Sequence, residues 1–132
     1  MSIKNLVPHD IGDCGSVQMM YAGSIAFDTE DASTGVELCT LPANIIVTKA
    51  VAVVGTAFNA GTTNVLTVGT NDDVNNLLGS SDVTEGTAGD YSKNTFLHLA
   101  AKTKVKAKFT QTGTAATAGA ADIYLEVVRC PA

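Results

Sequence analysis

The sequence predicts an all-β protein, an antiparallel β-sandwich of the jelly-roll type. Apolar and polar residues alternate in several short segments, and glycine-containing turns separate these segments. The chain has no Trp and 5% aromatic residues, so its core must be built from Val, Ile, Leu and Ala, which suits two sheets packed face to face. At 132 residues the chain is long enough for one domain, which we assign to residues 17–132.

The first part of the chain divides into an arm and two strands. Residues 1–16 show no period and contain Pro8, which predicts an extended N-terminal arm. Residues 17–27 have the composition of a strand. A short alternating strand follows at 36–41, and Pro42 ends it because proline lacks the backbone donor that a sheet needs.

The segment 45–56 has the strongest strand pattern in the sequence. Its residues are mostly apolar on both faces, which predicts a central strand that is buried on both sides. A glycine-containing turn follows at 59–62, and residues 65–68 resume the strand pattern. The sequence therefore predicts that these two segments pair as a hairpin.

Residues 69–92 form a long polar and acidic loop. Apolar residues at i, i+3 and i+4 spacing predict a helical turn over 72–78. The loop does not match an EF-hand, because Leu77 and Val83 stand where the motif, counted from Asp72, needs Gly and Glu. Long loops in small domains are often functional, so we select four of its carboxylates as candidate partner contacts: Asp72, Asp73, Asp82 and Glu85.

A lysine stripe marks the next strand, and it consists of Lys102, Lys104, Lys106 and Lys108. These residues alternate with other side chains and are four of the eight basic residues. Period two is typical of a strand with one solvated face and one buried face. We expect this strand, which starts within 96–100 and runs to about 110, to pair with 121–128 as a second hairpin. Asp122 and Glu126 would then lie opposite the lysines.

Two interpretations of the lysine stripe stay open. In the first, the lysines form a solvated strand face or protect a sheet edge from aggregation. In the second, they bind an acidic partner, either another protein or the acidic part of a neighbouring copy. The charge distribution fits the second interpretation: residues 1–90 hold two basic and eleven acidic side chains, and residues 91–132 hold six basic and two acidic ones. The four lysines are therefore candidate partner contacts.

Composition and motifs argue against several classes of function. The net charge of −5 argues against general nucleic-acid binding, and no run approaches the roughly 18 apolar residues of a membrane span. Cys14, Cys39 and Cys130 are widely spaced, which predicts reduced thiols and no metal site. His98 fits a structural role, and no motif for catalysis or for phosphate or dinucleotide binding is present. We expect neither an enzyme nor a bound cofactor. The first twenty residues lack the apolar segment of a signal peptide, which predicts synthesis and assembly in the cytosol.

A resemblance to a known family rests on the order of several segments. A buried strand is followed by Ala-Phe-Asn-Ala-Gly-Thr at 57–62, by Leu-Thr-Val-Gly-Thr at 66–70 and by the acidic loop. Together with the closing strands at 103–110 and 123–128, this order resembles the small jelly-roll cement or decoration proteins that coat the capsids of tailed bacteriophages. The resemblance spans roughly residues 45–129, and no contact residue is transferred by position.

The resemblance implies a non-enzymatic structural protein on the outside of a virion capsid, assembled in the host cytoplasm. Its partners would be the major capsid protein and copies of itself, as a homodimer or homotrimer, with no nucleic acid and no membrane. One alternative is a tail, baseplate or head-fibre component. An alternative of another class is a carbohydrate-binding jelly-roll module, for which Tyr21, Tyr91 and Tyr124 would be the available aromatic platforms.

Overall fold

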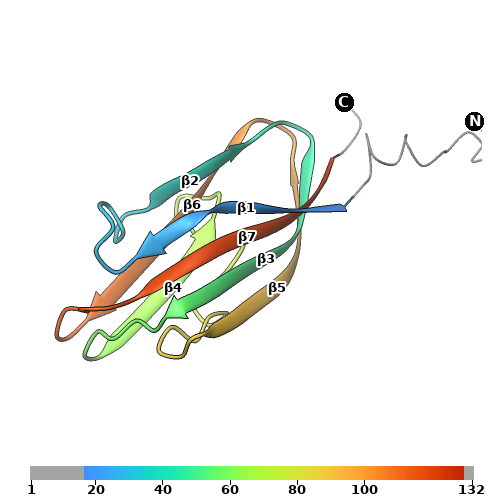
Figure 1. Ribbon diagram of the computed structural model, residues 1–132. Coiled ribbons are helices and arrows are strands. Elements are labelled where there is room, and N and C mark those ends of the chain that lie inside the picture. The colour runs from blue at the N-terminus through green and yellow to red at the C-terminus, as the bar shows by residue number, and fades with distance from the viewer. Residues whose placement is uncertain (1–16, 130–132) are drawn as a thin grey trace, which may run out of the picture.

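Seven antiparallel strands form two sheets in the computed structural model, which describes residues 17–129. One sheet has the order β1-β7-β3-β5 and the other has the order β2-β6-β4. Figure 1 shows β1, β7, β3 and β5 side by side in one layer, with β2, β6 and β4 in the second. The strands are β1 (Val17–Ala26), β2 (Val36–Leu41), β3 (Ile45–Thr56), β4 (Thr63–Gly69), β5 (Gly89–Leu99), β6 (Thr103–Thr112) and β7 (Ala120–Arg129). The predicted all-β antiparallel sandwich is confirmed.

The jelly-roll type stays a prediction. A jelly roll has eight strands, and within residues 17–129 an isolated bridge between Val68 and Leu78 stands beside β4 in place of an eighth strand. The predicted N-terminal arm at 1–16 lies outside the described residues, as do residues 130–132 of the predicted domain. Residues 17–129 contain no helix long and apolar enough to cross a membrane.

No two consecutive strands among β1 to β7 pair with each other. β3 pairs with β5 and β7, β4 pairs with β6, and β7 pairs with β1 and β3, so every connection crosses from one sheet to the other. Both predicted hairpins are therefore wrong. The turns at 57–62 and 113–119 are arches between sheets, and they bind each other because Gly61 donates its N–H to the Thr114 carbonyl at 2.8 Å.

Core packing explains why these turns connect the two sheets and do not form hairpins. β3 and β6 each carry one apolar face, and both faces are buried when the two strands lie in opposite sheets. Phe58 in the first arch then packs against Phe109 of β6, with ring centroids 4.5 Å apart. A hairpin would have placed the two strands in one layer and left this contact unmade.

β3 is central in its sheet, as predicted, but only one of its faces is buried. A bulge at Thr48 shifts the alternation, so that Val47 and Ala50 both face the core at 0% exposure. Val51 and Val53 lie on the outer face and are half-buried. The prediction of burial on both sides is wrong, because the second sheet covers only the inner face.

The loop between β4 and β5 covers residues 70–88, because β5 begins at Gly89. The single strand predicted from within 96–100 to about 110 is wrong: β5 ends at Leu99, and β6 begins at Thr103 in the other sheet. It contains no helical turn, because Val74 adopts a positive φ of 53°. Its apolar residues are nevertheless buried: Leu77 and Leu78 are 0% exposed and join the core. The loop is held to β4 by a hydrogen bond from the Val68 N–H to the Leu78 carbonyl at 3.0 Å.

Candidate interaction surfaces

The lysine stripe lies on β6 and shows the predicted alternation. Val105, Ala107 and Phe109 point into the core, with at most 2% exposure. The lysines between them therefore point to the outer face of the β2-β6-β4 sheet. Lys104 is exposed, Lys106 and Lys108 are half-buried, and Lys102 is an exposed residue just before the strand.

β6 is the central strand of its sheet, so the edge-protection interpretation of the lysine stripe is wrong. Both sides of its backbone bond to neighbours, β2 on one side and β4 on the other. The predicted partners of the lysines are also wrong, because Asp122 and Glu126 belong to β7 in the other sheet. The interpretations that remain are a solvated strand face and a surface for an acidic partner.

Glu37 of β2 supplies the carboxylate that faces the lysine stripe. Its Oε1 lies 3.1 Å from Lys104 Nζ, and both side chains are about 60% exposed. Such exposed pairs contribute only about 0.2–1 kcal/mol to stability. Lys106 is placed differently: a Cβ added at Gly35 would lie 3.6 Å from both Lys106 Cδ and Val74 Cγ2. The stem of Lys106 and the buried Val74 side chain therefore both lie beside Gly35.

The four acidic candidates of the loop have different environments. Asp72 and Asp73 are exposed. Asp82 forms an ion pair with Lys93 of β5, with Oδ2 3.2 Å from Nζ, and accepts a hydrogen bond from the Gly79 N–H. Glu85 is 7% exposed, and its carboxylate accepts a hydrogen bond from the Leu66 N–H at 2.8 Å. Of these four, Asp72 and Asp73 are therefore the most accessible at the surface.

An apolar surface on the other sheet was not identified from the sequence. Val17, Met19 and Tyr21 of β1 are 58%, 54% and 53% exposed, and Phe96 of β5 is 78% exposed. Tyr21 packs beside Tyr124 of β7, with ring centroids 5.3 Å apart. Alternation of Val17, Met19 and Tyr21 is visible in the sequence, but it does not tell which face of the strand meets the core. These residues lie on the outer face of the β1-β7-β3-β5 sheet.

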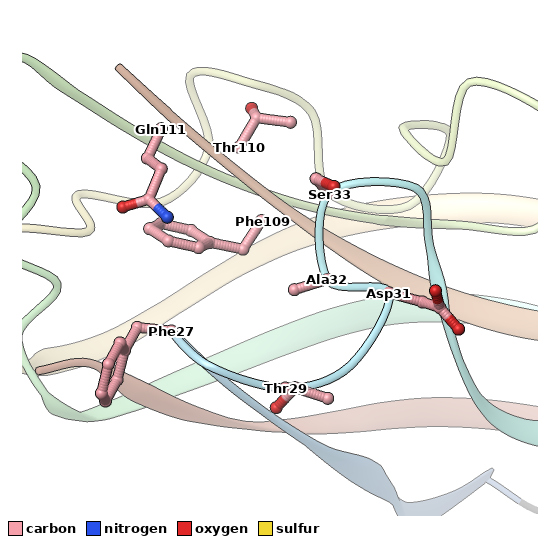
Figure 2. A pocket seen from close by; sticks show the side chains of 8 residues that line it. All are labelled: Phe27, Thr29, Asp31, Ala32, Ser33, Phe109, Thr110 and Gln111. Carbon is pink, nitrogen blue, oxygen red and sulfur yellow. The ribbon is translucent and has the colours of Figure 1, made fainter. Parts of the chain in front are cut away.

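A shallow cavity of about 330 Å³ lies where the turn between β1 and β2 meets the end of β6. Figure 2 shows the turn along one side and β6 along the other. Its lining offers one ionisable side chain, Asp31, together with hydroxyl and amide groups, so it lacks a paired acid and base. The lining residues are Phe27, Thr29, Asp31, Ala32, Ser33, Phe109, Thr110 and Gln111.

The groups expected for redox, metal or sugar chemistry lie in separate places. Residues 17–129 contain no cluster of three or more His, Cys, Asp or Glu side chains that could hold a metal ion. Burial raises the pKa of the Cys39 thiol, and His98 is exposed on the outer face of β5. The Tyr91 ring packs against the core and its hydroxyl donates to the Thr87 carbonyl at 2.6 Å, so it is not a free sugar platform.

No protein-family model matches the chain, and no curated protein sequence matches it. A solved structure does match: a chain of the structure described as "Cyanophage Pam1 capsid asymmetric unit". The two chains are 22% identical, the match covers 88% of this chain and 86% of that one, and the TM-score is 0.65. At this identity the match shows a shared fold, and the coverage shows that the likeness extends over nearly the whole of both chains.

Proposed function

We propose that this protein is a non-enzymatic structural component of a phage virion, and specifically a decoration or cement protein. It would bind the outside of the head and stabilise contacts between neighbouring capsid subunits. The observation that carries the proposal is the fold shared with a chain of the cyanophage Pam1 capsid asymmetric unit over 88% of this chain. The sequence resemblance to phage cement proteins, which rests on different evidence, leads to the same class.

The two outer faces of the sandwich support a role in assembly. A protein that bridges subunits must fold on its own and still leave surfaces exposed for binding. The lysine stripe on β6 suits an acidic surface of the major capsid protein, because one carboxylate from β2 and β4 faces it. That carboxylate is Glu37 of β2, the register partner of Lys106 and the ion-pair partner of Lys104. Lys108 lies opposite the uncharged Thr67 of β4.

The proposal is tested by adding the purified protein to phage heads that lack it. We expect binding to the head exterior, visible by electron microscopy of labelled protein, and greater resistance of the heads to heat and low ionic strength. Labelled protein on the tail or baseplate would favour the alternative location. Heads that are equally resistant with and without the protein would refute the reinforcing role.

The role of the lysine stripe has its own test. Changing Lys106 and Lys108 to Glu should weaken head binding at least about tenfold and reduce its dependence on salt, because charged contacts are screened by added ions. The matched control changes both residues to Arg, which keeps the charge and should keep the binding. Equal binding by the Glu and Arg variants would leave the lysines as a solvated strand face.

A further inference from the structure

The outer face of the β1-β7-β3-β5 sheet is organised in rows. Residues that are register partners on neighbouring strands share a face, so the outward side chains form four rows across the sheet. The first row is Val17, Val128, Ile46 and His98; the second is Met19, Glu126, Lys49 and Asn94; the third is Tyr21, Tyr124, Val51 and Ser92; the fourth is Ser24, Asp122, Val53 and Asp90. Each row is written in strand order from β1 to β5.

The first three rows combine apolar side chains with one opposite-charge pair. The first row is apolar over three strands, and the third has the Tyr21–Tyr124 pair beside Val51. Phe96, at 78% exposure, stands on β5 between the first and second rows. The charges of the second row are on its two central strands, with Glu126 on β7 and Lys49 on β3.

The sheet has a midline between β7 and β3, because two strands lie on each side of it. A twofold axis along this midline, parallel to the strands, leaves the position along the strand unchanged and exchanges β7 with β3 and β1 with β5. Glu126 of one copy then faces Lys49 of the other, and this contact occurs twice. Val128 faces Ile46 and Tyr124 faces Val51 in the same way. We propose that two copies of this chain pair face to face through this sheet about that axis.

A second copy fits this face better than it fits the other sheet. Two copies that met through the β2-β6-β4 sheet would place the lysine stripe of one against that of the other, and like charges in contact oppose association. On the β1-β7-β3-β5 face, the twofold arrangement places opposite charges together in the second row and apolar residues together on the two central strands of the first and third rows. At the sides, β1 of one copy meets β5 of the other, so that Val17 faces His98 and Tyr21 faces Ser92. This self-complementarity is what a twofold interface between identical chains requires.

The face is small for a dimer, so the pairing should be weak. Three rows about 6.6 Å apart across four strands about 4.8 Å apart give roughly 380 Å² of flat area per copy. This is about half of the roughly 800 Å² per partner of a standard interface. The fourth row carries two carboxylates, Asp122 and Asp90, and no basic side chain, so we expect it to stay solvated at the end of the contact.

The pairing extends the proposed function, on which it rests: it assigns one outer face to contact between copies and leaves the lysine stripe on the other face for the capsid. It is tested in solution without phage heads, so its failure does not affect the test of head binding.

The experiment uses two single variants and their mixture. Lys49→Glu and Glu126→Lys each place like charges across the twofold axis, and each should weaken the dimer at least about tenfold by analytical ultracentrifugation. An equimolar mixture should form heterodimers by native mass spectrometry, because positions 49 and 126 are both acidic in the first variant and both basic in the second, so opposite charges meet at both contacts. Within each chain the two residues still carry like charges, so recovery on mixing reports contact between copies.

Controls separate folding from association. Phe96→Ser should also weaken the dimer, by roughly thirtyfold if this ring is an interface anchor. Its urea midpoint, measured at a protein concentration where the wild type is monomeric, should be unchanged because the ring is exposed. Lys104→Ser, at an exposed position on the other sheet, should leave the dimer intact. Three results would each overturn the pairing: a wild-type chain that stays monomeric at about 100 µM, a wild-type trimer, or folded single variants whose mixture does not recover dimers.

Discussion

Glu85 connects the long loop to the edge of β4, and its removal should be costly. Its carboxylate accepts a hydrogen bond from the Leu66 N–H at 2.8 Å, and its own carbonyl accepts one from the Phe58 N–H at 2.9 Å. Leu66 is 0% exposed, so Glu85→Ala leaves a buried backbone donor without a partner. A hydrogen bond to a charged group contributes about 1.5–3 kcal/mol, and leaving the donor unsatisfied costs a similar amount. We therefore expect a loss of about 2 kcal/mol in the free energy of unfolding.

Equilibrium urea unfolding, followed by circular dichroism, measures this loss. With a slope of about 1–3 kcal/mol per molar urea for a small protein, the midpoint should fall by roughly 1 M. The matched control is Glu37→Ala, which removes an exposed carboxylate whose pair with Lys104 is worth less than about 1 kcal/mol. Glu85→Gln keeps an acceptor and should fall between the two. If Glu85→Ala cost no more than Glu37→Ala, the reasoning about the buried carboxylate would be refuted.

Three further predictions concern other buried groups. Thr67 Oγ1 is buried without a hydrogen-bond partner, so Thr67→Val should be neutral or should raise the free energy of unfolding by about 1 kcal/mol in the same urea assay; a loss of that size would show that the hydroxyl is satisfied. Gly119 has a φ of 144°, and a Cβ there would overlap the Phe58 ring. Gly119→Ala should therefore lower the free energy of unfolding by roughly 2–4 kcal/mol and lower the thermal midpoint. An unchanged midpoint would mean that the arch can shift to accept the methyl group. Burial raises the pKa of the Cys39 thiol, so at a given pH its thiolate fraction is smaller than that of free cysteine. In a variant whose other two cysteines are serine, alkylation by iodoacetamide should be slower than for free cysteine and should reach half its maximal rate at a higher pH. A rate equal to that of free cysteine would contradict this prediction.

Most strands were predictable from the sequence because alternation is a local property, but β5 was missed as a separate strand because its end at 96–99 was read as the start of β6. The segment 36–41 coincides with β2, 45–56 coincides with β3, and the lysine alternation correctly assigned the buried and solvated faces of β6. Strand pairing is not local. An arch between sheets and a hairpin within one sheet have similar turn residues, and only the burial of Phe58 against Phe109 across the sandwich distinguishes them. Both hairpin predictions failed for this reason.

The candidate surfaces were predictable only in part. The lysine stripe was visible because four charged residues alternate within one segment, but its central position in the sheet depends on β2 and β4, which are distant in sequence. The apolar outer face was missed for a related reason. Val17, Met19 and Tyr21 have the composition of core residues, and their exposure follows from which side of β1 the second sheet covers.

The crossing connections also change the meaning of the charge asymmetry along the chain. Residues 1–90 are strongly acidic and 91–132 basic, but each sheet takes strands from both parts: β1 and β3 with β7 in one, β2 and β4 with β6 in the other. The two parts therefore do not become two poles of the molecule. Positive charge gathers on one outer face, through β6 alone, while the opposite outer face keeps its Lys49–Glu126 row and its apolar rows.

Two chemically different faces on opposite sides of one sandwich can bind two partners without competition. Under the proposed arrangement, the face with paired opposite charges binds a copy of itself, and the lysine face, which repels its own copy, binds a surface of the opposite sign. A dimer built in this way presents two lysine stripes that point away from each other. It could therefore contact two acidic sites that lie on opposite sides of it, for example on subunits between which it inserts, and binding at the second site would gain from effective concentration. Bridging of neighbouring capsid subunits would then follow from the placement of the faces, and a variant that breaks the dimer should lose head reinforcement while each monomer still binds weakly.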